Sequence, residues 1–130
     1  MSETELIELA IHARERAFAP YSKFKVGAVL LAEDGTAFTG CNVESASYGL
    51  TICAERTALV KGVSVGHRKF QCVVVVADTA RLTPPCGACR QMLWEFAPQA
   101  DVILANLHGA IERHTVAGLL PHGFDGSLLS

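Results

Sequence analysis

Long hydrophobic runs and clusters of basic residues are both missing from this chain of 130 residues. Half of the residues are apolar, but glycine, proline and charged residues divide them into runs far shorter than the roughly 20 residues that span a bilayer. The first five residues include two glutamates and no basic residue, so they lack the basic, apolar layout of a secretory signal. These features predict a cytoplasmic protein with no membrane partner.

A strongly basic charge balance is also lacking, because the net charge is −2. Proteins that bind nucleic-acid backbones usually carry a stripe of lysine and arginine, and none is recognisable here. We therefore expect a small-molecule substrate without phosphate groups and no nucleic-acid partner.

The chain has five cysteines, whereas a secreted disulfide framework would normally use an even number. A reducing compartment with thiolates bound to metal fits this number better. Cys72 begins an apolar, β-branched run and is expected to be an inert core thiol, and Cys41 is interpreted in the same way. The length fits a single domain with one core, assigned to residues 1–130.

Apolar periodicity divides the chain into helices and strands. Residues 4–18 carry an apolar stripe at helical spacing that ends before Pro20, and Asp34-Gly35 predicts a tight hairpin turn. Strands are predicted at 25–31, 37–43, 71–77, 102–105 and 111–116, and further helices at 53–63, 86–96 and 116–120. Because strands and helices alternate after the hairpin, part of the sheet should be parallel. We predict an α/β protein with three layers, α/β/α, around a central mixed five-stranded sheet.

Three cysteines lie at the starts of two predicted helices. Cys53 and Cys86 each open a helix, and Cys89 lies three residues after Cys86 on the same side of the first turn. The positive end of a helix favours thiolate over thiol, and the thiolate is the form that binds metal. Three protein ligands leave the fourth position of a tetrahedral zinc ion open, as in catalytic sites. Spacing alone leaves three interpretations open: catalytic zinc, structural zinc closed by a fourth cysteine, and a redox dithiol.

Glu55 is the best candidate for a general acid–base group beside these cysteines. Residues two apart do not share a helix face, so Glu55 can point toward the metal only if Cys53 is a cap residue outside the helix. Arg56 and Arg90 each follow a ligand segment, and either guanidinium could donate hydrogen bonds to the sulfurs and offset their excess negative charge. Arg56 is the stronger candidate of the two.

The cysteine segments resemble the two zinc motifs of the small, homotetrameric, three-cysteine type of cytidine deaminase. The first reads Thr-Ile-Cys-Ala-Glu-Arg-Thr-Ala at 51–58, and the second reads Pro-Cys-Gly-Ala-Cys-Arg-Gln at 85–91. Supporting segments are Tyr-Ser-Lys-Phe-Lys-Val-Gly-Ala at 21–28, Gly-Cys-Asn-Val-Glu at 40–44, and Leu-Leu-Pro at 119–121 followed by Phe124. The resemblance implies a cytidine deaminase-like fold, a homotetramer with sites near subunit contacts, and one Zn²⁺ per subunit held by Cys53, Cys86 and Cys89.

By this resemblance, the reaction is the hydrolysis of cytidine and deoxycytidine to the uridine forms and ammonia, in pyrimidine salvage. Glu55 is implied to take a proton from the attacking water and to pass it to the ring nitrogen and then to the departing ammonia. The implied substrate-binding residues are Asn42 and Glu44 at the sugar, Phe24 at the base, Ala54, and Tyr48 and Phe124 in segments near the subunit contact.

Three rival functions fit parts of the sequence. A deaminase of the nucleoside antibiotic blasticidin S has a similar size and the same zinc layout, but Phe24, Arg56 and the pair Asn42 and Glu44 favour the nucleoside enzyme. A polynucleotide editor shares the metal chemistry, but the low basicity opposes it. A non-catalytic zinc module predicts four protein ligands and no exchangeable water.

Overall fold

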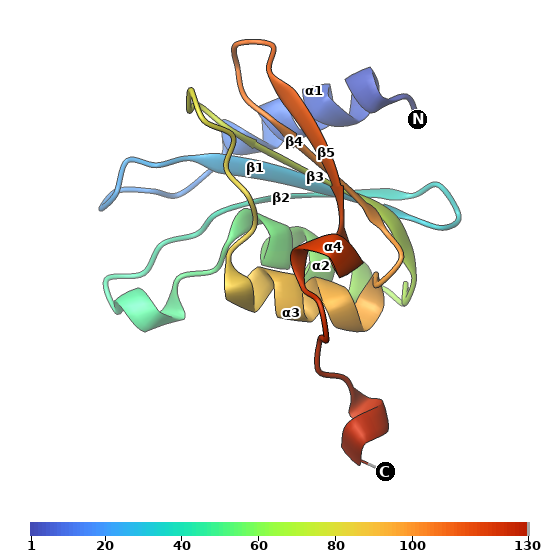
Figure 1. Ribbon diagram of the computed structural model, residues 1–130. Helices are drawn as coiled ribbons and strands as arrows, with labels where there is room; N and C mark the ends of the chain where they lie inside the picture. Colours follow the sequence, from blue (N-terminus) through green and yellow to red (C-terminus); the bar gives the residue numbers. More distant parts are fainter. Residues whose placement is uncertain (130) are drawn as a thin grey trace.

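The predicted helices and strands all form in the computed structural model, which describes residues 1–129 (Figure 1). No helix within those residues is both long and apolar enough to cross a membrane. The elements follow in the order α1 (Glu3–Arg14), β1 (Val26–Ala32), β2 (Ala37–Cys41), η1 (Tyr48–Leu50), α2 (Ala54–Ser64), β3 (Phe70–Ala77), α3 (Gly87–Phe96), β4 (Asp101–Ala105), β5 (Ile111–Thr115), α4 (Val116–Leu119) and η2 (Gly126–Leu129).

The five strands form one mixed sheet in the order β2-β1-β3-β4-β5. β1 pairs antiparallel with both β2 and β3, β3 pairs parallel with β4, and β5 closes the edge antiparallel to β4. The β1–β2 hairpin turns at Gly35, whose φ of +92° suits glycine, and Asp34 Oδ1 accepts a hydrogen bond from the Thr36 amide at 2.9 Å. The mixed sheet and its parallel portion confirm the sequence prediction.

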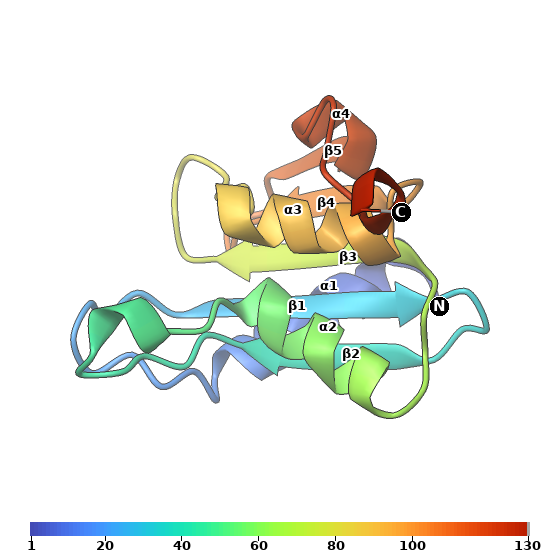
Figure 2. The same cartoon turned by 90° about the horizontal axis from the view of Figure 1, so that it is seen from below.

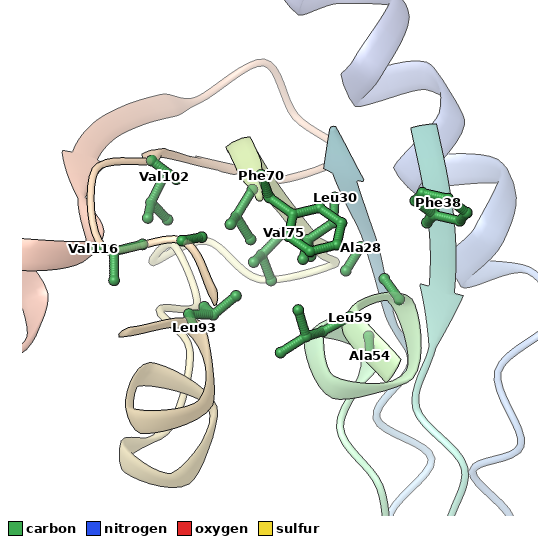
Figure 3. Packing of buried hydrophobic residues seen from close by; sticks show 14 of the residues in the cluster. Ala28, Leu30, Phe38, Ala54, Leu59, Phe70, Val75, Leu93, Val102 and Val116 are labelled. Atoms are coloured by element: carbon green, nitrogen blue, oxygen red, sulfur yellow. The ribbon is translucent and has the colours of Figure 1, made fainter. Parts of the chain in front are cut away.

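Alternate residues of a strand point to opposite sides of the sheet. In this sheet the residues on both sides are apolar, and each side carries a hydrophobic cluster. α1 covers one face, while α2 and α3 lie side by side on the other (Figures 1 and 2). The cluster toward α1 includes Leu6, Ala10, Val29, Leu31, Val74 and Val76. The cluster toward α2 and α3, shown in Figure 3, includes Ala28, Leu30, Leu59, Val73, Val75 and Leu93. Every residue of β1 is buried, as expected for a central strand that is covered on both faces.

α1 is shorter than predicted, since it ends at Arg14 and not at residue 18. The chain leaves the helix because Phe18 pairs with the segment after β2. The Phe18 amide donates to the Asn42 carbonyl oxygen at 3.0 Å, and the Glu44 amide donates to the Phe18 carbonyl oxygen at 2.8 Å. These pairings bring the segment before β1 against Asn42 and Glu44.

Gly40 of β2 lies against the first turns of α2. A Cβ atom at Gly40 would lie 2.5 Å from the carbonyl oxygen of Ala54 and 2.5 Å from the amide nitrogen of Ala58, closer than real Cβ atoms approach. Glycine therefore allows the helix backbone to approach the strand. Since α2 begins directly after Cys53, this contact also positions one of the three candidate ligands.

Candidate metal centre and substrate pocket

Cys53 and Cys86 are the N-cap residues of α2 and α3, and Cys89 lies in the first turn of α3. The backbone of Cys53 is extended (φ −71°, ψ 155°), as is that of Cys86 (φ −67°, ψ 169°). Cys53 therefore lies outside the helical dihedrals, which confirms the condition placed on the orientation of Glu55.

The three sulfurs form one compact group. The Sγ atoms of Cys53 and Cys86 are 3.8 Å apart, and those of Cys86 and Cys89 are 3.5 Å apart. All three lie within 4.8 Å of one another, and the group includes neither Cys41 nor Cys72. Tetrahedral ligands at a Zn–S distance of about 2.3 Å are about 3.8 Å from one another. The thiols thus have the span that zinc requires, and the geometry opposes a four-thiolate site.

Neighbouring donors stabilise negative charge on Cys53. A hydrogen bond from the Cys89 thiol, supported by the Arg56 guanidinium, lowers the pKa of Cys53 from 9.0 to about 5. Arg56 Nη2 lies 3.6 Å from Cys53 Sγ and 3.3 Å from the Thr51 carbonyl oxygen, to which it donates. The bond to Cys53 and burial raise the pKa of Cys89. Arg56 Nε is buried without a hydrogen-bond partner in the described part of the chain. Its N–H group is therefore available to donate to a sulfur that becomes negatively charged.

Glu55 is buried in the first turn of α2, with 5% of its surface exposed. Burial is the main reason that the pKa of its carboxyl group rises from 4.5 to about 7, and the charge of nearby Cys53 adds to the shift. A carboxyl group that changes protonation near neutral pH is suited to both accepting and donating a proton.

Cys53, Cys86 and Glu55 line one cavity of about 260 Å³. This volume lies just below the usual range for ligand pockets, about 300–1,000 Å³, so it fits only a small organic molecule. Four of the predicted substrate-binding residues line it: Phe24, Asn42, Glu44 and Ala54. The other lining residues are Val26, Thr51, Cys53, Glu55, Val75, Thr83, Pro84 and Cys86.

Residues 1–105 match the family model described as the cytidine and deoxycytidylate deaminase zinc-binding region. The chain belongs to the cytidine deaminase family. The cytidine deaminase of Halalkalibacterium halodurans is 54% identical over 125 residues, which cover 95% of each chain. The crystal structure of cytidine deaminase from Burkholderia pseudomallei superimposes with a TM-score of 0.93 at 49% identity, covering 95% of this chain and 100% of that one. The blasticidin-S deaminase of Bacillus cereus is more distant, at 27% identity over 92% of this chain and 89% of that protein.

Asn42 and Glu44 make different contacts within the pocket wall. Asn42 is buried, and its side chain accepts from the Val26 amide at 2.9 Å and donates to the Phe24 carbonyl oxygen at 2.7 Å. The carboxylate of Glu44 accepts from the Tyr21 amide at 3.0 Å. Both side chains therefore hold the segment at 21–26 while they line the cavity.

Tyr48 and Phe124 do not line the cavity of the chain to which they belong. Tyr48 is 76% exposed and packs edge-on against Tyr21, with ring centroids 6.1 Å apart. Phe124 is 51% exposed, and its amide donates to Gln91 Oε1 at 3.2 Å. One chain alone does not bring either ring to the substrate pocket.

Arg90 was predicted as a possible donor to a sulfur, but it donates to backbone carbonyl oxygens instead. Its Nε donates to the Pro85 carbonyl oxygen at 2.8 Å, and its Nη1 donates to the Leu119 carbonyl oxygen at 3.0 Å. Arg90 directly follows Cys89, so its side chain is rotated by roughly 100° around the helix. It therefore joins the turn before Cys86 to α4 through backbone contacts.

Sequence reasoning missed five residues that line the cytidine deaminase pocket: Val26, Thr51, Val75, Thr83 and Pro84. Val26 and Val75 lie within predicted strands, where residues are assigned to a core by default. Thr83 and Pro84 belong to the loop after β3, and no periodicity marks the direction of loop side chains. Their one available signal was their closeness to Cys86 in the sequence.

Proposed function

We propose that this protein catalyses the hydrolytic deamination of cytidine and deoxycytidine, with release of uridine or deoxyuridine and ammonia. The proposal rests on one observation above all: three thiols form one compact group, and two of them line a small cavity together with a buried carboxyl group. Family membership supplies the substrate class, and pyrimidine salvage is the corresponding physiological role. A cytoplasmic location is proposed with it, since all five cysteines are free.

Cys53, Cys86 and Cys89 are proposed to hold one Zn²⁺ ion. Support comes from the spacing of the sulfurs, from the lowered pKa of Cys53 and from the spare donor of Arg56. When bound, zinc makes a water molecule acidic enough to be a nucleophile near neutral pH, provided that one ligand position is open. Arg56 would offset the excess negative charge of three thiolates and orient Cys53.

Glu55 is proposed to move the protons of the reaction. Its carboxylate accepts a proton from water as the oxygen bonds to the ring carbon that bears the amino group. The carboxyl group then protonates the ring nitrogen. It next takes the remaining proton of the added hydroxyl and passes it to the amino group, so that ammonia leaves as the C–N bond breaks and the ring carbonyl forms. A positioned acid–base group of this kind typically contributes roughly 10²–10⁴-fold to the rate.

Phe24, Asn42, Glu44 and Ala54 are proposed to hold the nucleoside. The Phe24 ring offers an apolar surface to the base at one wall of the cavity. Glu44 retains acceptor capacity, which suits a sugar hydroxyl donor. Asn42 retains one amide hydrogen beyond the one donated to Phe24, so it can contact the sugar or its oxygen atoms.

A homotetramer is proposed as the functional assembly. Apolar side chains are exposed along the segments that flank the pocket, with Tyr48 at 76%, Leu50 at 70% and Ile52 at 42%. Three large apolar side chains exposed within five residues form a surface that favours a protein–protein contact. Burial against further copies would cover it and bring Tyr48 and Phe124 toward a neighbouring pocket. Light scattering should give four times the 13.9 kDa mass of one chain.

Incubation of the purified protein with cytidine tests the activity. Ultraviolet absorbance should change as ammonia appears, a chelator should stop both, and added zinc should restore them. Glu55→Ala should keep stoichiometric zinc and lose nearly all turnover, while Glu8→Ala, an exposed change on α1, should behave as wild type. Blasticidin S is the comparison substrate. Zinc-loaded protein that releases ammonia from neither cytidine nor deoxycytidine would refute the proposal.

A further inference from the structure

The backbone between α1 and β1 takes a strained path beside the pocket. Lys23 has a φ of +61°, a left-handed conformation that is unfavourable for a residue with a side chain. Such a conformation persists only where surrounding contacts enforce it. One enforcing contact is the hydrogen bond from the Lys23 amide to the Ala19 carbonyl oxygen at 3.1 Å. The others converge on the residue before it, Ser22.

The Ser22 hydroxyl joins two residues of the pocket wall. It donates to Glu44 Oε2 and accepts a hydrogen bond from the Phe24 amide at 2.9 Å. The Ser22 amide also donates to Glu44 Oε1 at 3.2 Å, where the Tyr21 amide donates as well. These hydrogen bonds hold the pKa of the Glu44 carboxyl group below its ordinary value. Glu44 is thus kept ionised and oriented from one side.

The lone pairs of Glu44 show what this arrangement leaves for a ligand. A carboxylate has about four acceptor sites, two on each oxygen. Two amides occupy Oε1, and the Ser22 hydroxyl occupies one site on Oε2. One acceptor site on Oε2 remains for a ligand, and the hydrogen bond from the Ser22 hydroxyl fixes the direction in which that site points. Phe24 is fixed at the same time, because its amide binds Ser22 and its carbonyl oxygen accepts from Asn42.

We propose that Ser22 is a positioning residue, which aims Glu44 at the 2′- or 3′-hydroxyl of the nucleoside sugar. This inference rests on the proposed function and deepens it, since Ser22 itself touches no reacting atom. Its loss should weaken nucleoside binding and leave the chemical step unchanged, because Glu55 and the three cysteines lie on other elements.

Ser22→Ala is the direct test, measured by steady-state kinetics on the zinc-loaded protein. The KM for cytidine should rise about tenfold, as expected for a hydrogen bond to a charged group, while kcat stays within about twofold. Ser22→Thr keeps the hydroxyl and should restore KM to within about threefold of wild type. Ser64→Ala, a matched change at the exposed end of α2, should alter neither constant.

The sugar hydroxyls separate positioning from a general structural effect. The KM for 2′,3′-dideoxycytidine should change by no more than about twofold in Ser22→Ala, because this substrate lacks the 2′- and 3′-hydroxyls that Glu44 would bind. In a Glu44→Gln background, Ser22→Ala should have little further effect on cytidine. Calorimetry with uridine gives a readout without turnover, and its Kd should rise about tenfold.

An unchanged KM for cytidine in Ser22→Ala would overturn the proposal, and so would equal increases for cytidine and its dideoxy analogue. If Ser22→Ala does not fold by circular dichroism, Ser22→Cys provides the same comparison with a weak donor. Wild-type protein that binds uridine but releases no ammonia from cytidine refutes the proposed function instead, and the calorimetric comparison still decides the role of Ser22.

Discussion

Replacement of Glu55 by glutamine should remove a pH-dependent loss of stability from protein that has been stripped of metal with a chelator. Glu55 is 5% exposed, and the pKa of its carboxyl group rises from 4.5 to about 7 on folding. Each pKa unit corresponds to about 1.4 kcal/mol, so the shift is equivalent to about 3 kcal/mol. Bound zinc would place positive charge beside the carboxylate and reduce the shift, which is why the stripped protein is the right sample.

The sign follows from the direction of the shift. Because folding raises this pKa, the protonated carboxyl group contributes stability that is fully present below pH 4.5 and is lost as the pH rises through 7. Relative to Glu55→Gln, the wild type should therefore lose about 3 kcal/mol of unfolding free energy across this window. The lowered pKa of Cys53 acts in the opposite direction, but both proteins contain Cys53, so the comparison largely cancels its effect.

Urea denaturation with reducing agent and chelator, repeated from about pH 4 to about pH 9, measures the difference. Glu8→Gln is the matched control, because Glu8 is exposed on α1 and the chemical change is the same. Its curve should run parallel to that of the wild type. If the Glu55→Gln curve is also parallel over the whole range, the carboxyl group is not titrating in a buried site, and the reasoning fails.

Two further substitutions test the metal centre and its support. Gly40→Ala should lower the unfolding free energy by about 1–3 kcal/mol and weaken zinc binding, because the new Cβ pushes against the start of α2. Gly126→Ala, where no described atom lies within 4 Å of the added carbon, should do neither in thermal melts and zinc titrations. Cys86→Ser should lose stoichiometric zinc, whereas Cys72→Ser, outside the thiol group, should retain it in metal analysis after gel filtration. Full zinc content in Cys86→Ser would contradict the ligand assignment.

The secondary structure could be predicted where the pattern is complete within a short segment. The β-branched run of β3 and the helix starts after Cys53 and Cys86 are such cases. The end of α1 was predicted wrongly, because it depends on the pairing of Phe18 with the segment after β2. No local propensity reports that competition between helix and strand pairing.

The thiol group could be expected from spacing, but its surroundings could not. Arg56 was the preferred sulfur partner of the two arginines, and its guanidinium does contact Cys53 Sγ. The backbone contacts of Arg90 depend on where α4 packs. Ser22 carried no signal of its hydrogen bonds to Glu44, since loop geometry and the pairing of distant segments create them.

The sequence by itself determined the chemical inventory: three thiols at helix starts, one carboxyl group beside them, and apolar patterns that build a covered mixed sheet. Those properties depend on residue type and on periodicity within one element, which short-range sterics control. Only the tertiary structure decided that the sulfurs lie within 4.8 Å of one another, that Glu55 is desolvated and that Ser22 orients Glu44. Each of these depends on strand pairing and helix packing between distant segments, because both desolvation and distance are properties of the packed molecule.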